Sequence, residues 1–345
     1  MKASKVLFLV FLVLIIVGIG VISLYVGNHE PVEPSPKTIV VPDDYATIEW
    51  AIGNATNGDT IYVKSGIYSV NRDTGYPLRI NKPLSLIGEN SNNTTIIGGS
   101  NGEHGSGAVT ISVESDNVTI SGFTIKSYDF PTSAWAYSGI SIGADYCRII
   151  GNNIVNCATG IRGGGSFSVI SNNSITDNFE YGLQIGGGNF TNITISGNNL
   201  DSNENYFDAD NSVIFGNNIT NSWWGIFINS NCAIYGNNIT GNTNYGISMV
   251  SNNTVFENYI ANNSIGIRAG NHNTVYNNNF INNTQQINIT SNNTNSWDNG
   301  TAGNYWSNYN GTDNDKDGIG DTPYIIDANN QDRCPLVEPY PNYSD

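Results

Sequence analysis

The chain has 345 residues, of which only 12% are charged, and its 29 acidic against 13 basic residues give a net charge of −16. So acidic a chain is repelled by a phosphate backbone, which argues against nucleic acid as a partner. Its surface must consist mainly of neutral Asn, Ser, Thr and Tyr side chains, which suit sugars. The few, scattered cysteines predict buried thiols without disulfides; they are Cys147, Cys157, Cys232 and Cys334.

The chain begins with a short basic segment and an uncharged apolar run from Val6 to Val26. The run is long enough to span a bilayer and longer than the ~7–15-residue core of a cleaved signal peptide. We predict that residues 1–27 form a transmembrane anchor, with a signal segment as the alternative. The basic segment stays in the cytoplasm, so we expect a single-pass protein of the cell membrane whose bulk is extracytoplasmic. Residues 28–37 contain three prolines and predict a linker.

Residues 42–54 predict a short amphipathic helix with three apolar residues on one face. We expect Asp43 or Asp44 to cap its N-terminus. The helix should cover the first coil of the repeats that follow, since an exposed coil offers unpaired backbone groups.

Short β-rich segments follow the helix and predict the strands of the first coils. They are Thr60–Val63, Leu78–Ile80, Leu84–Gly88, Thr95–Gly98, Val109–Ile111 and Val118–Ile120. The next segment, Ser127–Ser138, is aromatic and aperiodic, and it predicts a projecting loop.

From Ile149 to Ile289 the sequence repeats about every 20 residues. Each unit contains a short apolar strand, a small residue, a pair of Asn residues, an apolar residue and a second strand. The apolar residue after the Asn pair recurs as Ile154, Ile175, Leu200, Ile219, Ile239, Ile260 and Phe280. A fixed period of this length indicates a solenoid. We therefore predict an all-β, right-handed parallel β-helix over residues 38–296, with ~4.8 Å between coils.

The Asn pairs have a structural reason in such a fold. Asn tolerates the left-handed backbone region that tight bends need, and stacked Asn side chains can hydrogen-bond from coil to coil. Bends are therefore favoured over a polar binding strip. Many Asn residues also lie in Asn-x-Ser/Thr sequons, so we expect a glycoprotein in an exported chain. Examples are Asn54, Asn117, Asn218, Asn238, Asn252 and Asn310.

Two columns of residues are predicted to face solvent on the second strand of each unit, because successive strand residues point to opposite faces. One column contains Arg162, Gln184, Asp208, Phe227, Ser248, Arg268 and Asn288. The neighbouring column contains Tyr181, Asn205, Trp224, Tyr245 and Ile265, with Trp223 and Glu204 beside it.

Exposed aromatics beside carboxylates predict a sugar-stacking platform. The candidate ligand-binding residues are Tyr181, Gln184, Trp223, Trp224, Phe227 and Tyr245, and the candidate catalytic residues are Glu204, Asp208 and Asp210. The alternative is that these aromatics are ordinary strand residues that cover the coil. Glycosidase chemistry needs two carboxylates at a defined separation. Lyase chemistry also needs a neutralising cation, and the register puts Arg162 and Arg268 too far from Asp208.

Residues 297–345 break the repeat and predict a C-terminal cap. Within them, Asp313–Asp321 carries carboxylates at positions 1, 3, 5 and 9, Gly at 6 and a carbonyl at 7, as in calcium loops. The predicted ligands are Asp313, Asp315, Asp317, Ile319 and Asp321. Position 12 is Tyr324 rather than Glu, with Asp327 as a substitute. We expect a structural calcium ion, with a solvated acidic turn as the alternative. Copper is not expected, because His, Met and Cys form no cluster with soft-ligand spacing.

The coils from Val118 to Ile289, together with the tail segments Gly303–Tyr309 and Asp315–Tyr324, resemble the NosD family of β-helix proteins, which are similar to carbohydrate-binding and sugar-hydrolase (CASH) repeats. The resemblance implies an exported right-handed parallel β-helix. Family members in denitrifiers assist maturation of the copper enzyme nitrous-oxide reductase beside an ABC transporter. The predicted anchor, the sequons and the missing copper ligands make this chain more similar to NosD-like surface proteins of archaea.

Three functions remain open. The first is a membrane-anchored, non-catalytic protein that binds a polysaccharide or a surface protein. The second is a polysaccharide lyase or glycoside hydrolase that uses the face with Glu204, Asp208 and Asp210. The segment from Tyr45 to Tyr68 also resembles the start of pectin-active β-helices, but their catalytic signatures are absent. The third, implied by the resemblance alone, is an accessory of a metalloenzyme-maturation or ABC-transporter system.

Overall fold

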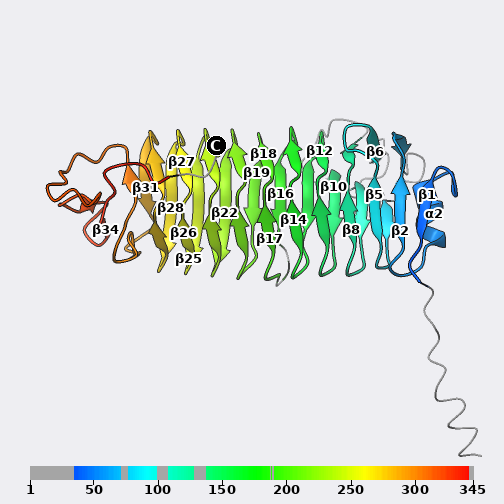
Figure 1. Cartoon of the computed structure of the whole chain (residues 1–345), viewed down its shortest axis with the longest axis horizontal. Coiled ribbons are helices and arrows are strands. Elements are labelled where there is room, and N and C mark those ends of the chain that lie inside the picture. The colour runs from blue at the N-terminus through cyan, green and yellow to red at the C-terminus, as the bar shows by residue number, and fades with distance from the viewer. Residues whose placement is uncertain are drawn as a thin grey trace, which may run out of the picture. The chain divides into compact units, whose positions relative to one another are not determined.

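The computed structural model describes residues 35–70, 77–98, 108–127, 137–186, 188 and 190–341. Almost all of them belong to the compact unit Lys37–Asp345. This unit is a parallel β-helix, as predicted, whose coils stack along one axis (Figure 1). The apolar run 6–26 and most of the expected loop at 127–138 lie outside the described residues.

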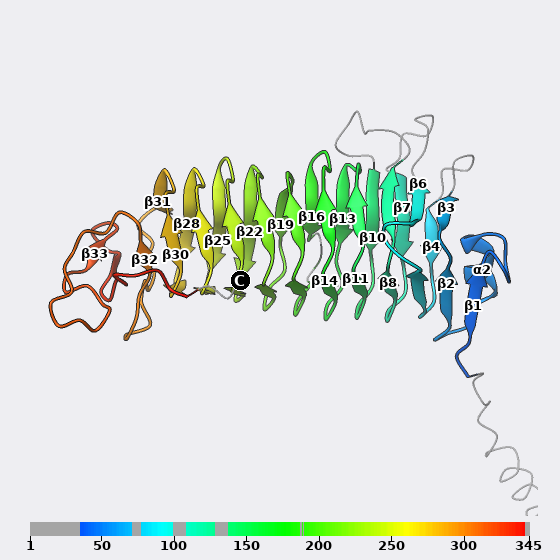
Figure 2. The same ribbon diagram turned by 45° about the horizontal axis from the view of Figure 1, so that its top comes forward.

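The strands form three long parallel sheets, which we call sheets A, B and C (Figure 2). Sheet A contains β1 (Thr38–Val41), β2 (Thr60–Val63), β5 (Ser85–Gly88), β8 (Thr119–Ser121), β11 (Arg148–Ile150), β14 (Val169–Ser171), β17 (Thr194–Ser196), β20 (Val213–Phe215), β23 (Ala233–Tyr235), β26 (Thr254–Phe256) and β29 (Thr274–Tyr276). Sheet B contains β3 (Gly66–Ser69), β6 (Thr94–Gly98), β9 (Thr124–Ser127), β12 (Asn153–Val155), β15 (Ser174–Thr176), β18 (Asn199–Asp201), β21 (Asn218–Thr220), β24 (Asn238–Thr240), β27 (Tyr259–Ala261), β30 (Asn279–Ile281) and β32 (Tyr305–Trp306). Sheet C contains β4 (Leu78–Ile80), β7 (Ala108–Val113), β10 (Tyr137–Ile142), β13 (Thr159–Gly163), β16 (Tyr181–Ile185), β19 (Glu204–Phe207), β22 (Trp224–Ser230), β25 (Tyr245–Ser251), β28 (Ile265–Asn271) and β31 (Gln285–Ile289).

The core forms because every coil places apolar residues at the same inward positions. Ile154, Ile175 and Leu200 are partners in neighbouring strands of sheet B, and each is 0% exposed. The column continues in register to Phe280. The repeating apolar residue predicted from the sequence is therefore confirmed as the core of sheet B.

Each coil turns at three corners, which we name AB, BC and CA after the sheets that they join. The residue at the corner often has positive φ, for example Asn172 (54°), Asn262 (57°) and Asn252 (55°). Asn and Gly fill most of these positions because they adopt the left-handed region at the lowest cost. The next residue points inward.

In the pairs Asn172–Asn173 and Asn277–Asn278 the first Asn is the bend residue and the second is buried. In pairs such as Asn237–Asn238 the preceding Gly is the bend residue, the first Asn is buried and the second lies in a strand of sheet B. The expectation that the Asn pairs form bends is therefore confirmed for the first kind and wrong for the second, where Gly adopts the left-handed region.

The buried Asn residues of each corner form hydrogen-bonded ladders along the solenoid. At the AB corner each Asn accepts, through Oδ1, from the backbone N–H of the Asn one coil before it. The members of this AB ladder are Asn152, Asn173, Asn198, Asn217, Asn237, Asn258, Asn278 and Asn304. Because these side chains also satisfy buried carbonyls, the ladder lets polar groups occupy the core at low cost.

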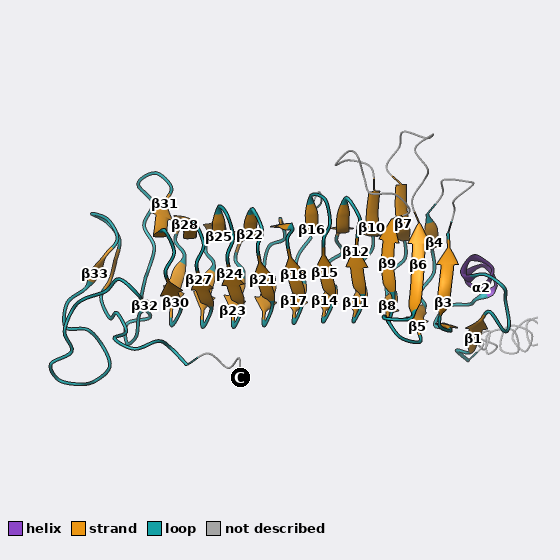
Figure 3. Cartoon of the chain, turned by 90° about the horizontal axis from the view of Figure 1, so that it is seen from above, coloured by secondary structure: helices purple, strands orange, loops and turns teal. Residues whose placement is uncertain are grey.

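The N-terminal end is covered by helix α2 (Ile48–Asn54), which packs against β1, β2 and β4 (Figure 3). Ile48, Ala51 and Ile52 are buried, as predicted. The predicted cap is wrong: the side chain of Thr47 accepts from the Trp50 N–H at 3.2 Å. Asp43 instead pairs with Lys64, one coil further on, and Asp44 Oδ2 accepts from the Val40 N–H at 2.7 Å.

The C-terminal cap continues the solenoid rather than starting after residue 296. Strand β32 extends sheet B through Trp306, and a hairpin of β33 (Tyr324–Ile325) and β34 (Gln331–Asp332) follows. The AB ladder ends here, where Asp332 Oδ2 accepts from the Asn304 N–H at 2.7 Å and from Trp306 Nε1 at 2.8 Å. A carboxylate suits the last position of the ladder because it accepts hydrogen bonds and has no N–H group that needs an acceptor.

Candidate functional site

The predicted column on sheet C is in register except at Asp208, and its member Ser248 is buried rather than solvent-facing because Arg268 lies over it. Gln184 pairs with Tyr206, and Tyr206 pairs with Phe227, so Tyr206 occupies the position assigned to Asp208. Asn205 is likewise misassigned: it is fully buried, opposite Leu183. The cause is a shorter coil with a β-bulge opposite Tyr181–Leu183, which the average period of the repeat conceals.

Two tryptophans at the start of β22 form the centre of an aromatic platform. Trp223 is 54% exposed and Trp224 is half-buried. With its amide turned so that oxygen faces the indoles, Asn244 accepts from Trp223 Nε1 at 3.3 Å and from Trp224 Nε1 at 3.1 Å. One polar side chain from the next coil therefore orients both rings while Trp223 stays open to solvent.

Further aromatic rings continue the platform along sheet C. Tyr206 and Phe227 stack with centroids 4.9 Å apart and an interplanar angle of 11°, and Trp224 is tilted by 34° against Phe227. On the following coils, the guanidinium of Arg268 lies 5.7 Å above the ring of Tyr245. The stacked rings already use one face each on one another, so Trp223, Trp224 and the ends of the stack offer the free aromatic surface.

The candidate carboxylates Asp208 and Asp210 lie just beyond the end of β19 and face outward, separated by buried Ala209. Asp208 Oδ1 accepts from Asn229 Nδ2 at 3.1 Å, and Asp210 Oδ1 accepts from the Ser230 N–H at 3.2 Å. Both carboxylates are thus tied to the next coil. They border the platform, but their hydrogen bonds fit a structural role.

Glu204 has a different neighbour, Glu180, which the sequence analysis missed. The Glu204 N–H donates to the Glu180 carbonyl at 3.0 Å, so the two residues lie on adjacent coils. Burial raises the pKa of both carboxyls, and the charge of Glu180 raises the pKa of Glu204 further, whereas Arg162 opposes the rise at Glu180. Tyr181 lies beside them, opposite Glu204 in the sheet. This group borders the platform on its N-terminal side.

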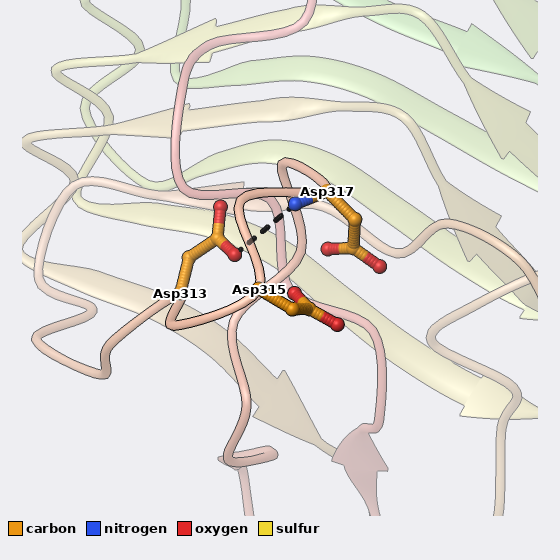
Figure 4. Close-up of side chains that lie close together, drawn as sticks. All are labelled: Asp313, Asp315 and Asp317. Atoms are coloured by element: carbon orange, nitrogen blue, oxygen red, sulfur yellow. Dashed lines mark hydrogen bonds between the residues drawn. The ribbon is translucent and has the colours of Figure 1, made fainter.

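The acidic loop of the cap brings together three of its predicted ligands. Oxygens of Asp313, Asp315 and Asp317 lie within 4.8 Å of one another (Figure 4). Asp313 accepts from the N–H groups of Lys316, Asp317 and Gly318, which closes the turn. The pKa of Asp315 is raised, first by the charge of Asp317.

The other predicted ligands do not join this cluster. Asp321 Oδ2 accepts from Asn314 Nδ2 at 2.6 Å and from the Asn314 N–H at 3.0 Å, so it braces the loop. Tyr324 at position 12 stacks on Trp306, with centroids 4.3 Å apart. At the CA corner the Asn ladder runs from Asn273 through Asn295 to Asn330. Asp327 ends this ladder by accepting from Asn330 Nδ2. Ile319 pairs with Leu336 in an antiparallel bridge.

Within the described residues, the soft ligands that copper prefers do not converge. All four cysteines are free, and burial raises the pKa of Cys147 and Cys232 to about 11 and that of Cys157 to about 12, so these thiols stay protonated. Of the described residues, only the hard oxygen ligands of the Asp313, Asp315 and Asp317 group come close enough together to hold a metal ion. The described residues therefore do not fit a copper centre.

Two clefts among the described residues lie at the cap. One, of about 590 Å³, is lined by Gln285, Asn308, Tyr324 and neighbouring residues. The other, of about 530 Å³, is lined by His272, Trp297, Arg333 and neighbouring residues. The platform itself is an open face, which suits an extended ligand better than a small enclosed one.

Comparison with known protein families agrees with the β-helix fold. Residues 170–311 match the sequence model of the family described as "Periplasmic copper-binding protein (NosD)". No curated protein matches the chain. Within the part of the chain that the structure describes, no helix has the length and apolar character to cross a membrane.

Solved structures share the fold at low sequence identity. The ORF18 protein of Geobacillus virus E2 is 16% identical, with a TM-score of 0.55 over 84% of this chain, and the chain spans 65% of its length. The Dettilon tailspike protein gp208 is 16% identical, with a TM-score of 0.45, 74% of this chain and 68% of that chain covered. Pectate lyase Pel9A is 15% identical, with a TM-score of 0.47, 76% of this chain and 80% of that chain covered. The resemblance to the NosD family is thus confirmed over residues 170–311, and the chain has the parallel β-helix fold.

Proposed function

We propose that this protein is anchored in the membrane by residues 1–27 and binds a glycan, without cleaving it, on the outer face of sheet C. The observation that carries the proposal is the indole pair of Trp223 and Trp224, oriented by Asn244 and open to solvent. An aromatic ring with fixed orientation offers a flat apolar face, while nearby hydroxyl, amide and carboxylate groups can bind sugar hydroxyls.

The charges near the platform support a neutral ligand. Glu180, Glu204, Asp208 and Asp210 lie along its N-terminal side, and Arg268 lies over Tyr245. A polyuronate would meet these carboxylates on the N-terminal side of the platform, and like charges that meet at a binding face disfavour association. We therefore expect neutral polysaccharides to bind in preference to acidic ones.

Binding of the purified full chain to immobilised neutral and acidic polysaccharides tests the proposal. Trp223→Ala should weaken retention because it removes the most exposed ring. The matched control is Trp50→Ala, which removes a tryptophan that is 65% exposed on the N-terminal helix. Retention that both variants share with the wild type would reject the platform. Capture of a surface protein or of a transporter in place of a glycan would favour the partner-binding or accessory function.

A second candidate function rests on Glu180 and Glu204. The Glu204 N–H donates to the Glu180 carbonyl and the charge of Glu180 raises the pKa of Glu204, so the two side chains are near neighbours, and retaining glycosidases use two carboxyls that lie close together. A carboxyl whose pKa is raised can donate its proton to the glycosidic oxygen, while the ionised partner attacks the anomeric carbon. Release of short products from a bound polysaccharide, lost in Glu204→Gln and retained in Asp208→Asn, would establish this function in place of simple binding.

We also propose that calcium stabilises the C-terminal cap. Asp313, Asp315 and Asp317 supply carboxylate oxygens, the ligands that calcium prefers. The Ile319 N–H donates to Asp317 Oδ1 at 2.8 Å and so holds one of these carboxylates in place. The position-12 ligand is missing, so the affinity should be modest. The role is structural because the loop lies in the cap, far along the chain from the platform.

A further inference from the structure

The corners of the solenoid present a distinct class of Asn-x-Ser/Thr sequons. In six of them the Asn occupies the bend position, is exposed, and has φ between 51° and 59°. They begin at Asn117, Asn172, Asn192, Asn252, Asn262 and Asn282. The middle residue of each points into the core, as Val118, Asn173, Ile193, Asn253, Asn263 and Asn283 do.

This geometry puts both reactive parts of the sequon outside. Because the middle residue points inward, the Asn before it and the Ser or Thr after it both face outward. Asn262 and Ser264 are both exposed, and so are Asn282 and Thr284. Within the described residues, none of these six Asn side chains makes a hydrogen bond, whereas the backbone N–H of Asn252 donates to the Asn271 carbonyl at 3.3 Å. The corner is thus rigid while its side-chain amide is free.

Two other sequons show the contrast. Asn218 and Asn238 lie within strands of sheet B and are half-buried. Asn238 Nδ2 donates to Asn218 Oδ1 at 2.7 Å, and Asn218 Nδ2 donates to Asn199 Oδ1 at 2.7 Å. A sugar on either amide nitrogen would break this ladder and press against the neighbouring coils, which are ~4.8 Å away.

We infer that the six corner sequons are sites of N-glycosylation and that the strand sequons Asn218 and Asn238 are not. The reaction joins the Asn Nδ2 to the anomeric carbon of an oligosaccharide from a lipid-linked donor. The amide loses one proton, and the lipid phosphate is the leaving group. The sequence alone treats all of these sequons alike; corner exposure and strand hydrogen bonding separate them.

Glycans attached at the corners would leave the outer faces of the sheets accessible to a ligand. Asn117, Asn192 and Asn252 lie at the CA corner, Asn262 and Asn282 at the BC corner, and Asn172 at the AB corner. None lies within a strand, so attached sugars would project from the edges between sheets. The aromatic platform on sheet C stays open between two glycan-bearing edges.

Mass spectrometry of intact glycopeptides tests the inference. The full chain is produced in cells that have an oligosaccharyltransferase and its lipid-linked oligosaccharide donor. We expect glycan mass on the corner sequons and none on the peptides that contain Asn218 and Asn238. Asn252→Gln should remove one glycan and increase gel mobility, whereas Asn238→Gln should leave the glycan number unchanged.

A second variant separates loss of the glycan from disturbance of the bend by Asn252→Gln. Thr254→Val removes the sequon hydroxyl but leaves Asn252 in place, and it should abolish the same glycan. Equal occupancy of corner and strand sequons would overturn the inference. Absence of glycan from all six corner peptides in a host that glycosylates a control substrate would overturn it as well.

Discussion

Replacement of Asn237 by Ala tests whether the buried Asn ladder stabilises the solenoid. Asn237 is 2% exposed. Its Oδ1 accepts from the N–H and Nδ2 groups of Asn217 at 3.0 and 2.9 Å. Its Nδ2 donates to Asn258 Oδ1 at 2.9 Å and to the carbonyls of Ile214 and Tyr235, both at 3.0 Å. Alanine removes all five hydrogen bonds at once.

The size of the destabilisation depends on which hydrogen-bond partners of Asn237 have no other bond. Tyr235 still accepts from the Gly216 N–H, and Asn258 still accepts from the Asn237 N–H. The Ile214 carbonyl keeps its sheet A bond to the paired strand, so the Asn217 N–H is the buried group left without a partner. A buried group without a partner costs about 1–3 kcal/mol, and the other lost bonds add about 1 kcal/mol, so we expect the free energy of unfolding to fall by roughly 2–4 kcal/mol.

The adjacent Asn238 provides the matched control, because the same substitution one residue later affects the outer surface. Asn238 is half-buried and its Nδ2 makes one bond, to Asn218. We expect Asn238→Ala to cost about 0.5–1.5 kcal/mol. Urea unfolding of the full chain, followed by circular dichroism, measures both. Equal losses for the two variants would refute the argument that the inner ladder stabilises the coil.

Three further predictions concern the cap and the carboxylates. Burial raises the pKa of Asp332 from 3.8 to about 6, so its charged form is disfavoured in the folded state. The cap should therefore gain up to ~3 kcal/mol as the pH falls from 7 to 4; melting curves at both pH values should show this gain, and Asp332→Asn should lack it. Calcium added after EDTA treatment should raise the melting temperature of the cap in the wild type and in Asp177→Asn, but not in Asp315→Asn; an unchanged wild type would count against the site. If glycan products are released, Glu204→Gln should stop their release at least a hundredfold more strongly than Asp208→Asn, and equal rates would remove Glu204 from the chemistry.

The sequence predicted the parts of this protein that repeat. The inward column from Ile154 to Phe280 and the Asn pairs recur at similar spacing, and parallel pairing in register requires them to stack. The hydrogen-bonded ladders were expected for the same reason. Local pattern and global fold agree wherever one coil resembles the next.

Residues that differ from the repeat could not be predicted in this way. The shortened coil around Asn205 shifts Tyr206 into the position expected for Asp208, and only the strand pairing reveals it. The proximity of Glu180 to Glu204 stayed hidden for the same reason. Asp332 ends the AB ladder from 28 residues beyond Asn304, a contact that no local pattern encodes. Thr47 caps the N-terminal helix, whereas Asp43 pairs with Lys64 and Asp44 with the Val40 N–H.

The most direct test of the glycan-binding proposal is the affinity of the full chain for a neutral polysaccharide, measured for the wild type, Trp223→Ala and Trp50→Ala. We predict that Trp223→Ala weakens binding about tenfold, the equivalent of ~1.4 kcal/mol, while Trp50→Ala binds like the wild type. Binding that is indifferent to Trp223, or tighter to a polyuronate than to any neutral polysaccharide, would contradict the account.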